Sequence, residues 1–282
     1  MRGDAVLFEL RALPSLPSCL LNFVSLLPKG WTIHFWHSDS NAAMIRESSA
    51  LQPALASGRL VLTPMLSAVP WAYHAFCRNG SIALNRNLHN LLLASTDLWT
   101  SFMSPHVLVF QCDATLCPHP DRGLESFAHL TFVGASWPDG RCCNSGLSLW
   151  NRSFMVNFTK RFGNGRTRMR SYQNHVDVWA SAWLRRINAT QAARDAGQPI
   201  SGLSVITDFR DDRVTLPTST EGKYFAAETV YTRGYTPFGI HRAWDYIRQR
   251  EARLELKARC PRFDELAYSS DKNIRADIKN RC

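Results

Sequence analysis

Up to Gln111, segments with the apolar pattern of buried strands alternate with segments that have the apolar spacing of helices. The predicted strands are 5–10, 31–36, 59–63 and 107–111, and the predicted helices are 16–27, 41–55 and 82–103. Strands that alternate with helices in this order form a mostly parallel sheet with helices on both faces. The sequence therefore predicts an α/β protein whose first half resembles a nucleotide-binding (Rossmann-like) fold.

After Gln111 the regular alternation of strands and helices ends. We expect two short strands at 130–134 and 146–150, a helix at 171–186, and a final basic, amphipathic helix at about 242–258. The chain has 282 residues, of which 45% are hydrophobic, so it can bury a sizeable core, and no linker is evident. We therefore predict one domain, 1–282. Its parts are a nucleotide-binding half (1–113), an acceptor and catalytic half (114–245) and a basic helical tail (246–282).

The chain is basic, with a formal net charge of +10. The positive residues concentrate in 160–170, at Arg185 and Arg186, and from Arg242 onward, rather than in one stripe. Phosphate-bearing small molecules, anionic membranes and RNA all suit such charge. A solvated basic surface is the more common explanation, and we do not expect nucleic acid as the partner.

Eight cysteines are present, and none are spaced as Cys-x-x-Cys. Cys112 and Cys117 with His119 suggest zinc, but no second half of a zinc site follows at the usual spacing. We expect Cys112 to be a buried free thiol.

Four Asn-x-Ser/Thr sequons occur, at Asn79, Asn151, Asn157 and Asn188, and they favour the secretory pathway and the Golgi lumen. The chain as given opens without a signal or anchor segment, which leaves the cytoplasm open. An N-terminal membrane anchor missing from this sequence would reconcile the two observations.

Asp113 follows the apolar run 107–110, at the carboxyl end of a predicted interior strand. In open α/β sheets, ligands bind beyond the carboxyl ends of the strands. A carboxylate there can bind Mg²⁺ or Mn²⁺ that holds a diphosphate. The alternative is an aspartate that starts a turn or caps a helix.

Three neighbouring segments and three distant ones add to this observation. The neighbouring ones read VLVFQCDATLC, FAHLTFVGASWP and CCNSGLSLWNRSF, and the distant ones are FELR, WTIHFWHSDSN and PFGIHRAW. In type, order and spacing they resemble a family of glycosyltransferase-like domains of unknown function, found mainly in fungi and some bacteria. The resemblance covers nearly the whole chain and implies a single domain with a fold similar to the A-type glycosyltransferases.

The resemblance implies a nucleotide-sugar donor over the first half of the sheet and a divalent cation, Mn²⁺ or Mg²⁺, on its diphosphate. Asp113 and His241 are then the metal ligands. The substrate-binding candidates are Arg11, Gln111, Trp137, Asn144 and Gly146. For His241, a cap of the last helix is an equally good explanation.

Small residues at Asn144 and Gly146 would let backbone approach a sugar or diphosphate, although an ordinary hairpin turn would look the same. The resemblance points to Asp177 as a general base for the acceptor hydroxyl, where the alternative is an acid that serves the helix dipole. Glu228 matches a family acid that would bind the acceptor or support His241.

Two hypotheses lead. The first is an enzyme that moves a sugar from a nucleotide donor to a glycan or another hydroxyl acceptor. The second is a domain that binds a nucleotide sugar or glycan without turnover, because Gln111, Ser145 and Val176 stand where relatives have an acid, a glycine and an acid. A third, weaker one is a basic protein of RNA or membrane surfaces.

Overall fold

The computed structural model describes residues 1–69, 89–162, 175–198, 209 and 213–268. Some predictions therefore lie outside the described residues. They are the sequon at Asn79, the first part of the helix predicted at 82–103, most of the basic segment 160–170, the start of the helix predicted at 171–186 and the end of the tail, 269–282.

A six-stranded sheet forms the centre of the molecule, in the order β3-β2-β1-β4-β7-β6. Its strands are β1 (Gly3–Glu9), β2 (Trp31–His37), β3 (Leu60–Pro64), β4 (His106–Phe110), β6 (Phe132–Ala135) and β7 (Asn144–Asn151). The first four strands are parallel to one another, and β7 runs antiparallel to both β4 and β6. The predicted α/β fold with a mostly parallel sheet is confirmed.

The order of the parallel strands creates a switch point between β1 and β4. From β1 the chain moves outward to β2 and β3, and then returns to place β4 on the other side of β1. Val6 pairs with Val109, so the carboxyl ends of β1 and β4 lie side by side. In doubly wound sheets, this is where ligands bind.

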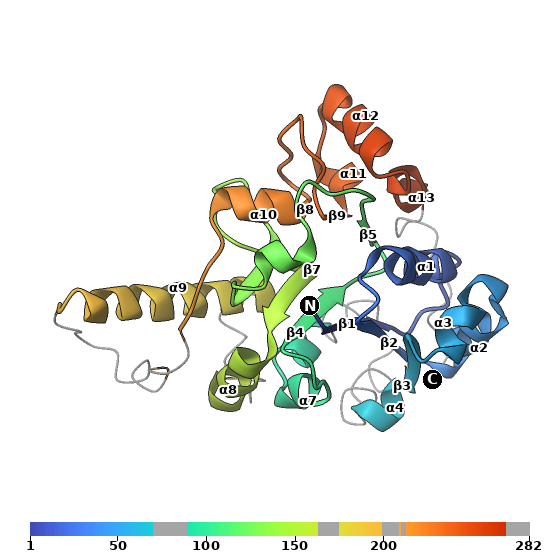
Figure 1. Cartoon of the computed structure of the whole chain (residues 1–282), viewed down its shortest axis with the longest axis horizontal. Helices are drawn as coiled ribbons and strands as arrows, with labels where there is room; N and C mark the ends of the chain where they lie inside the picture. The colour runs from blue at the N-terminus through green and yellow to red at the C-terminus, as the bar shows by residue number, and fades with distance from the viewer. Residues whose placement is uncertain (70–88, 163–174, 199–208, 210–212, 269–282) are drawn as a thin grey trace.

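Helices cover both faces of the sheet (Figure 1). The helical segments are α1 (Leu16–Leu26), α2 (Asp39–Glu47), η1 (Ser49–Leu51), α3 (Gln52–Ala56), α4 (Met65–Ala68), α7 (Thr96–Thr100), η2 (Leu124–Phe127), α8 (Arg152–Phe162), α9 (Val176–Asp195), α10 (Ser219–Phe225), α11 (Ala243–Tyr246), α12 (Arg250–Arg259) and α13 (Phe263–Tyr268). None of the described helices is both long and apolar enough to cross a membrane.

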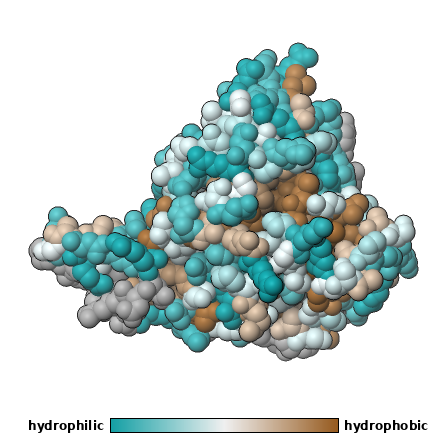
Figure 2. Space-filling model, in the orientation of Figure 1, coloured by the Kyte–Doolittle hydropathy of each residue, from teal (hydrophilic) through white to brown (hydrophobic). Residues whose placement is uncertain are grey.

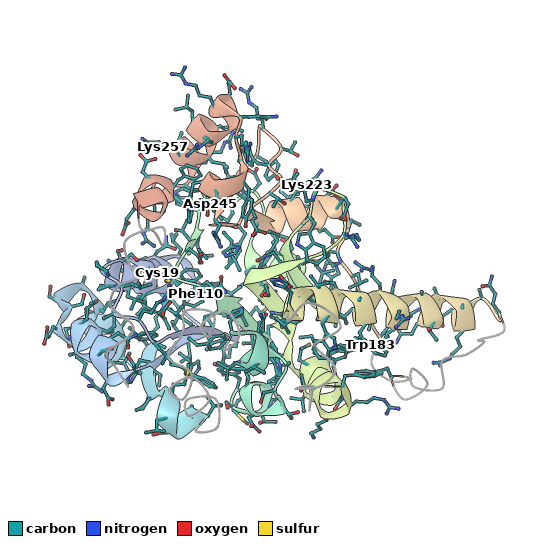
Figure 3. The ribbon with its side chains drawn as sticks, turned by 180° about the vertical axis from the view of Figure 1, so that it is seen from behind. Cys19, Phe110, Trp183, Lys223, Asp245 and Lys257 are labelled. Carbon is teal, nitrogen blue, oxygen red and sulfur yellow. A yellow bond between two sulfur atoms is a disulfide. The ribbon has the colours of Figure 1, made fainter. Side chains whose placement is uncertain are left out.

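Alternate residues of the strands enter two separate cores, because successive side chains of a strand point to opposite faces. On one face, Phe110 of β4 stacks on Phe23 of α1 with ring centroids 3.7 Å apart, and Cys19 of α1 joins the same core (Figure 3). On the other face, Trp99 of α7 and Trp150 of β7 pack with their centroids 5.5 Å apart.

A second, three-stranded sheet, which we call the small sheet, lies beyond the carboxyl end of β4. It has the order β5-β9-β8, with β5 (Ala114–Leu116), β8 (Ala226–Ala227) and β9 (Gly239–His241). The Asn22 side chain on α1 pairs with the backbone N–H and C=O of Leu116, at 2.8 and 3.2 Å. A disulfide joins Cys117, next to β5, to Cys260 at the end of α12, which rules out the zinc alternative. Cys112 is a buried free thiol, as expected.

Three predicted helices are interrupted. The helix expected at 41–55 ends at Glu47, because Ser48 is extended and a new helix, α3, starts at Gln52 with Pro53 in its first turn. Within 82–103, the helix that ends at 93 gives way to α7, because the Ser95 side chain accepts the Asp97 N–H and caps a new start. The last predicted helix, 242–258, is two helices, α11 and α12, because the backbone is extended at Ile247.

Candidate functional site

The turn after β1 is held by the Glu9–Arg11 ion pair and by hydrogen bonds from Cys112 and Asn41. Arg11 donates from Nε and Nη2 to the Glu9 carboxylate at 2.9 and 2.7 Å, and Cys112 Sγ donates to the same carboxylate at 3.4 Å. The Asn41 amide donates to the backbone oxygens of Glu9 and Arg11, at 2.7 and 3.1 Å. Arg11 therefore lies at the predicted edge of the sheet, with its guanidinium held by Glu9.

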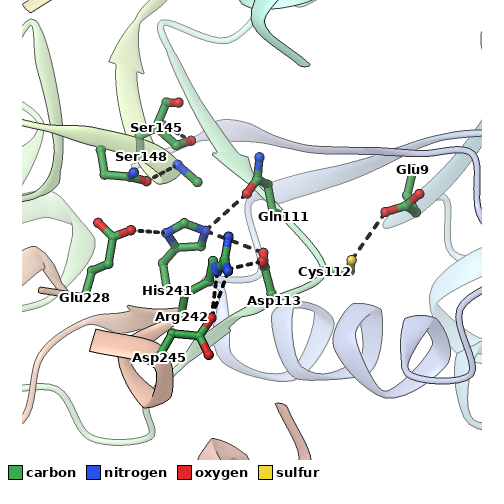
Figure 4. Close-up of polar contacts among 12 residues, drawn as sticks. Glu9, Gln111, Cys112, Asp113, Ser145, Ser148, Glu228, His241, Arg242 and Asp245 are labelled. Carbon is green, nitrogen blue, oxygen red and sulfur yellow. Dashed lines mark hydrogen bonds and ion pairs between the residues drawn. The ribbon is translucent and has the colours of Figure 1, made fainter. Parts of the chain in front are cut away.

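Asp113 and His241 converge at the carboxyl end of β4, although Asp113 ends the predicted nucleotide-binding half and His241 lies near the end of the predicted catalytic half. His241 Nε2 lies 3.1 Å from Gln111 Oε1 and 3.5 Å from Asp113 Oδ1 (Figure 4). The small sheet causes this convergence, because His241 on β9 pairs directly with Ala114 on β5, the residue after Asp113. Side chains that share a cation must lie this close together.

Glu228 contacts the other ring nitrogen of His241. Its Oε1 lies 3.2 Å from Nδ1, and both side chains are about 5% exposed. Among the described residues, Glu228 Oε2 has no hydrogen-bond partner. A buried carboxylate on one imidazole nitrogen fixes the orientation of the ring and the role of the other nitrogen.

The cluster is strongly coupled electrostatically. Burial by itself would lower the pKa of His241, but Asp113 and Glu228 outweigh it and raise the pKa to about 10. Burial would likewise raise the pKa of Asp113, but His241 and Arg242 lower it below its ordinary value. Without a ligand, the cluster therefore holds an imidazolium between two carboxylates at neutral pH.

Residues Asn144–Gly146, predicted as a tight turn, form the start of β7 and serve the cluster itself. A Cβ atom on Gly146 would collide with the His241 ring, so the space beside this glycine is filled by the imidazole. The Asn144 side chain accepts the Gly146 N–H at 2.7 Å, and the Gly146 carbonyl accepts the Gln111 N–H at 2.9 Å. The start of β7 therefore positions Gln111 through its backbone and leaves room for His241.

Asp177 lies in the first turn of α9, almost fully buried. Its carboxylate accepts the Val178 N–H at 2.8 Å and also the Ser145 N–H. Asp177 is therefore hydrogen-bonded to the start of β7, beside Gly146. Burial is the main cause that raises its pKa, and the Glu228 charge adds to the rise. A carboxyl group with a raised pKa is suited to proton transfer near neutral pH.

Trp137 lies half-buried in the loop between β6 and β7. The Arg141 guanidinium carbon is 5.9 Å from the centroid of its ring. The preceding residue, Ser136, accepts a hydrogen bond from Thr229, which follows Glu228. Trp137 is thus connected to the cluster through backbone neighbours.

Sequence reasoning missed two basic residues beside Asp113. Arg242 Nε lies 3.7 Å from Asp113 Oδ2, while Asp245 holds the same guanidinium. His89 is buried close enough for the charges of His241 and Asp113 to affect its pKa. Arg242 stands in the PFGIHRAW segment, so its position beside His241 was the available signal, whereas no sequence pattern marked His89.

The described residues contain no group of three or more His, Cys, Asp and Glu side chains that could hold a metal ion. The cluster nevertheless suits a cation that arrives with its substrate. Asp113 and Gln111 offer a carboxylate and an amide oxygen, and His241 offers an imidazole nitrogen once a cation displaces its Nε2 proton. Asp113 Oδ1 is buried without a hydrogen bond from any described residue. Mg²⁺-like ions are commonly held by one or two carboxylates plus substrate phosphates, so these donors fit the predicted cofactor.

The fold and the cluster define an α/β protein with a Rossmann-like half-sheet and a polar site at its switch point. The chain belongs to the family described as "Protein of unknown function (DUF5672)", whose sequence profile matches residues 79–241. The matched segment includes both Asp113 and His241. No curated protein sequence matches the chain.

Several solved structures show a distant likeness. The glycosyltransferase GlyE from Streptococcus pneumoniae TIGR4, in its apo form, is 12% identical, over 86% of this chain and 54% of GlyE, with a TM-score of 0.42. Mouse xyloside xylosyltransferase 1 is 10% identical, over 86% of this chain and 97% of that one, with a TM-score of 0.45. The mannosyltransferase PcManGT from Pyrobaculum calidifontis, in complex with GDP-Man and Mn²⁺, is 13% identical, over 95% and 68%, with a TM-score of 0.37. The chain thus spans about half the length of GlyE.

Proposed function

We propose that this protein is a glycosyltransferase that moves a sugar from a nucleotide-sugar donor to a hydroxyl group of a glycan or another acceptor. The observation that carries the proposal is the convergence of Asp113, Gln111 and His241 beyond the adjacent ends of β1 and β4. The order of motifs that resembles glycosyltransferase-like domains supports the same function. We expect the donor diphosphate to bind at the switch point of the sheet, where ligands of such sheets bind.

In this proposal Asp113, Gln111 and His241, the last after loss of its Nε2 proton, would hold a divalent cation, Mn²⁺ or Mg²⁺. The cation would supply Lewis-acid stabilisation of the departing nucleoside diphosphate. The Glu228 carboxylate lies 3.2 Å from Nδ1 of His241 as an ion pair, and so orients Nε2 toward the proposed donor site. Gly146 leaves room for the imidazole in that orientation.

The transfer itself is a displacement at the anomeric carbon. The acceptor oxygen forms a bond to that carbon, the bond from the carbon to the diphosphate oxygen breaks, and the electron pair leaves with the nucleoside diphosphate. If the displacement is direct, Asp177 takes the proton of the acceptor hydroxyl, because its raised pKa makes it a competent base.

Asp113→Ala tests the function. With Mn²⁺ and a panel of UDP- and GDP-sugars, the wild-type protein should hydrolyse or transfer one donor, and the variant should lose at least about 100-fold in turnover. Asp195→Ala, at an exposed aspartate that pairs with Arg213 on the surface, is the matched control and should keep its activity. A wild-type protein that neither binds nor turns over any donor would refute the proposal.

Asp177→Asn tests the assignment of the base. The variant should lower kcat by roughly 10² to 10⁴ while donor affinity stays unchanged, because the amide cannot take a proton. Transient kinetics and donor titration separate the two effects. If Asp177→Asn weakens donor binding and leaves kcat unchanged, Asp177 is a binding residue and not the base.

A second candidate function is the binding of a nucleotide sugar without turnover. It is favoured by the pairing of Asp113 with two cationic side chains, His241 and Arg242, together with an amide at Gln111. In the assay above, this function predicts donor binding that Asp113→Ala abolishes, with no transfer or hydrolysis in the wild-type protein.

A further inference from the structure

Arg242 is placed beside Asp113 by a backbone conformation that residues with side chains rarely adopt. It has φ +49° and ψ +24°, in the left-handed region. Its N–H donates to the Asp113 carbonyl at 3.2 Å, and its carbonyl accepts the Asp245 N–H at 3.0 Å. Non-glycine residues in this region are uncommon and concentrate at functional sites, where the surrounding structure holds them in place.

The guanidinium of Arg242 has two ionic partners, one close and one more distant, and it also lies over the Tyr246 ring, 5.9 Å from its centroid. Nη2 and Nε donate to Asp245 Oδ2 at 2.8 and 3.1 Å, whereas Nε lies 3.7 Å from Asp113 Oδ2. About a third of each of these three side chains is exposed to solvent. Asp245 therefore anchors the guanidinium, and the weaker contact with Asp113 is the one that an incoming anion can replace (Figure 4).

A guanidinium carries five N–H donors in a planar fork, so it can keep Asp245 and still donate to a phosphate oxygen. If the Arg242 guanidinium leaves Asp113, its positive charge lies partly buried near the cationic His241, which is costly unless another anion replaces the carboxylate. The replacing group must therefore be anionic and must accept several hydrogen bonds. A diphosphate meets both requirements.

We infer that Arg242 is the residue that recognises the diphosphate of the donor: on binding, its guanidinium moves from Asp113 to a phosphate oxygen while Asp245 holds it. This inference rests on the proposed function, since it assumes a nucleoside diphosphate at Asp113. The Arg242 side chain would then be the reason that the protein binds a nucleoside diphosphate more tightly than the bare nucleoside.

The test compares wild type, Arg242→Gln and Arg242→Lys by calorimetric titration with UDP and GDP and with uridine and guanosine, in the presence and absence of Mn²⁺. Arg242→Gln should weaken diphosphate binding by about tenfold or more and leave nucleoside binding unchanged, because a charge-assisted hydrogen bond is lost. Arg242→Lys keeps the charge without the fork and should fall between. Arg248→Gln, an exposed arginine on the same segment, is the control.

Melting temperatures equal to that of wild type show that the variants are folded. Unchanged diphosphate affinity in both Arg242 variants, with wild-type binding intact, overturns this inference alone. Equal losses for diphosphate and nucleoside also overturn it, because Arg242 would then shape the whole site. If wild type binds neither UDP nor GDP, the proposed function fails, and this inference fails with it.

Discussion

His89 and Gly146 show how single residues shape the site without bearing its charge. Gly146 has no side chain because the His241 ring fills that space. His89 is buried with its ring 5.3 Å from that of Phe8, and its Nε2 has no hydrogen-bond partner among the described residues. Burial, together with the positive charge of His241, lowers the pKa of His89 to about 4. His89 is therefore neutral in the folded protein at pH 7.

The buried neutral His89 predicts a loss of stability in acid. An unfolded histidine binds its proton near pH 6.5, so the contribution of His89 is fully present above that pH and is lost as the pH falls toward 4. The slope reaches about 1.4 kcal/mol per pH unit. In urea unfolding from pH 7 to 4, His89→Gln should show a shallower decline than wild type. Equal slopes in wild type and the variant would contradict the prediction.

Asp113 could be singled out from the sequence because its signal is local: an apolar strand followed by a carboxylate. Its partners could not be placed in the same way. Gln111 and His241 are 130 residues apart in the chain and meet only because β5 and β9 pair. The ion pair of Asp113 with Arg242 likewise depends on a left-handed backbone conformation, which no residue type at that position signals.

At the scale of elements, the strands of the central sheet were predictable and the small sheet was not. Strands β1 and β4 contain the apolar runs 5–8 and 107–110, which is the pattern of strands buried on both faces, and β2 is rich in aromatic and β-branched residues. Strands β5, β8 and β9 have two or three residues each, too few for any periodicity to appear. Their pairing is decided by tertiary contacts.

The disulfide between Cys117 and Cys260 is the covalent brace of the small sheet. It ties the end of β5 to α12, and α1 and α13 are joined nearby by hydrogen bonds of Ser18 with Arg262 and Glu265. A disulfide of this kind persists in oxidising compartments, which the sequons also favour. Asn157 and Asn188 are exposed, whereas the Asn151 side chain accepts the Phe154 N–H at 3.0 Å.

Removal of this disulfide should lower the free energy of unfolding by about 2–5 kcal/mol, because it closes a loop with a sequence separation of 143 residues. The measurement is urea unfolding of wild type and of the double variant Cys117→Ala/Cys260→Ala, each with and without reductant. Reductant should destabilise wild type and have a much smaller effect on the double variant. A wild-type curve that reductant leaves unchanged would show that the link is absent or unimportant.

At the scale of the whole molecule, apolar and hydrophilic surfaces are unevenly distributed. Figure 2 shows apolar residues in the middle of one face, below the helices at the top of the view, with hydrophilic residues around them. The net charge of +10 suits an anionic ligand, but no single basic stripe accounts for it. The anion that we propose binds at one defined place, the switch point between β1 and β4.

The sequence by itself determined the α/β class, the run of parallel strands and the edge of the sheet at which Asp113 lies, because strand and helix periodicity and strand-end residues are local properties. Only the tertiary structure decided the strand order, the small sheet, the disulfide partners and the meeting of Asp113 with His241, Glu228 and Arg242. These depend on contacts between residues far apart in the chain, which are selected by how the two cores pack on either face of the sheet.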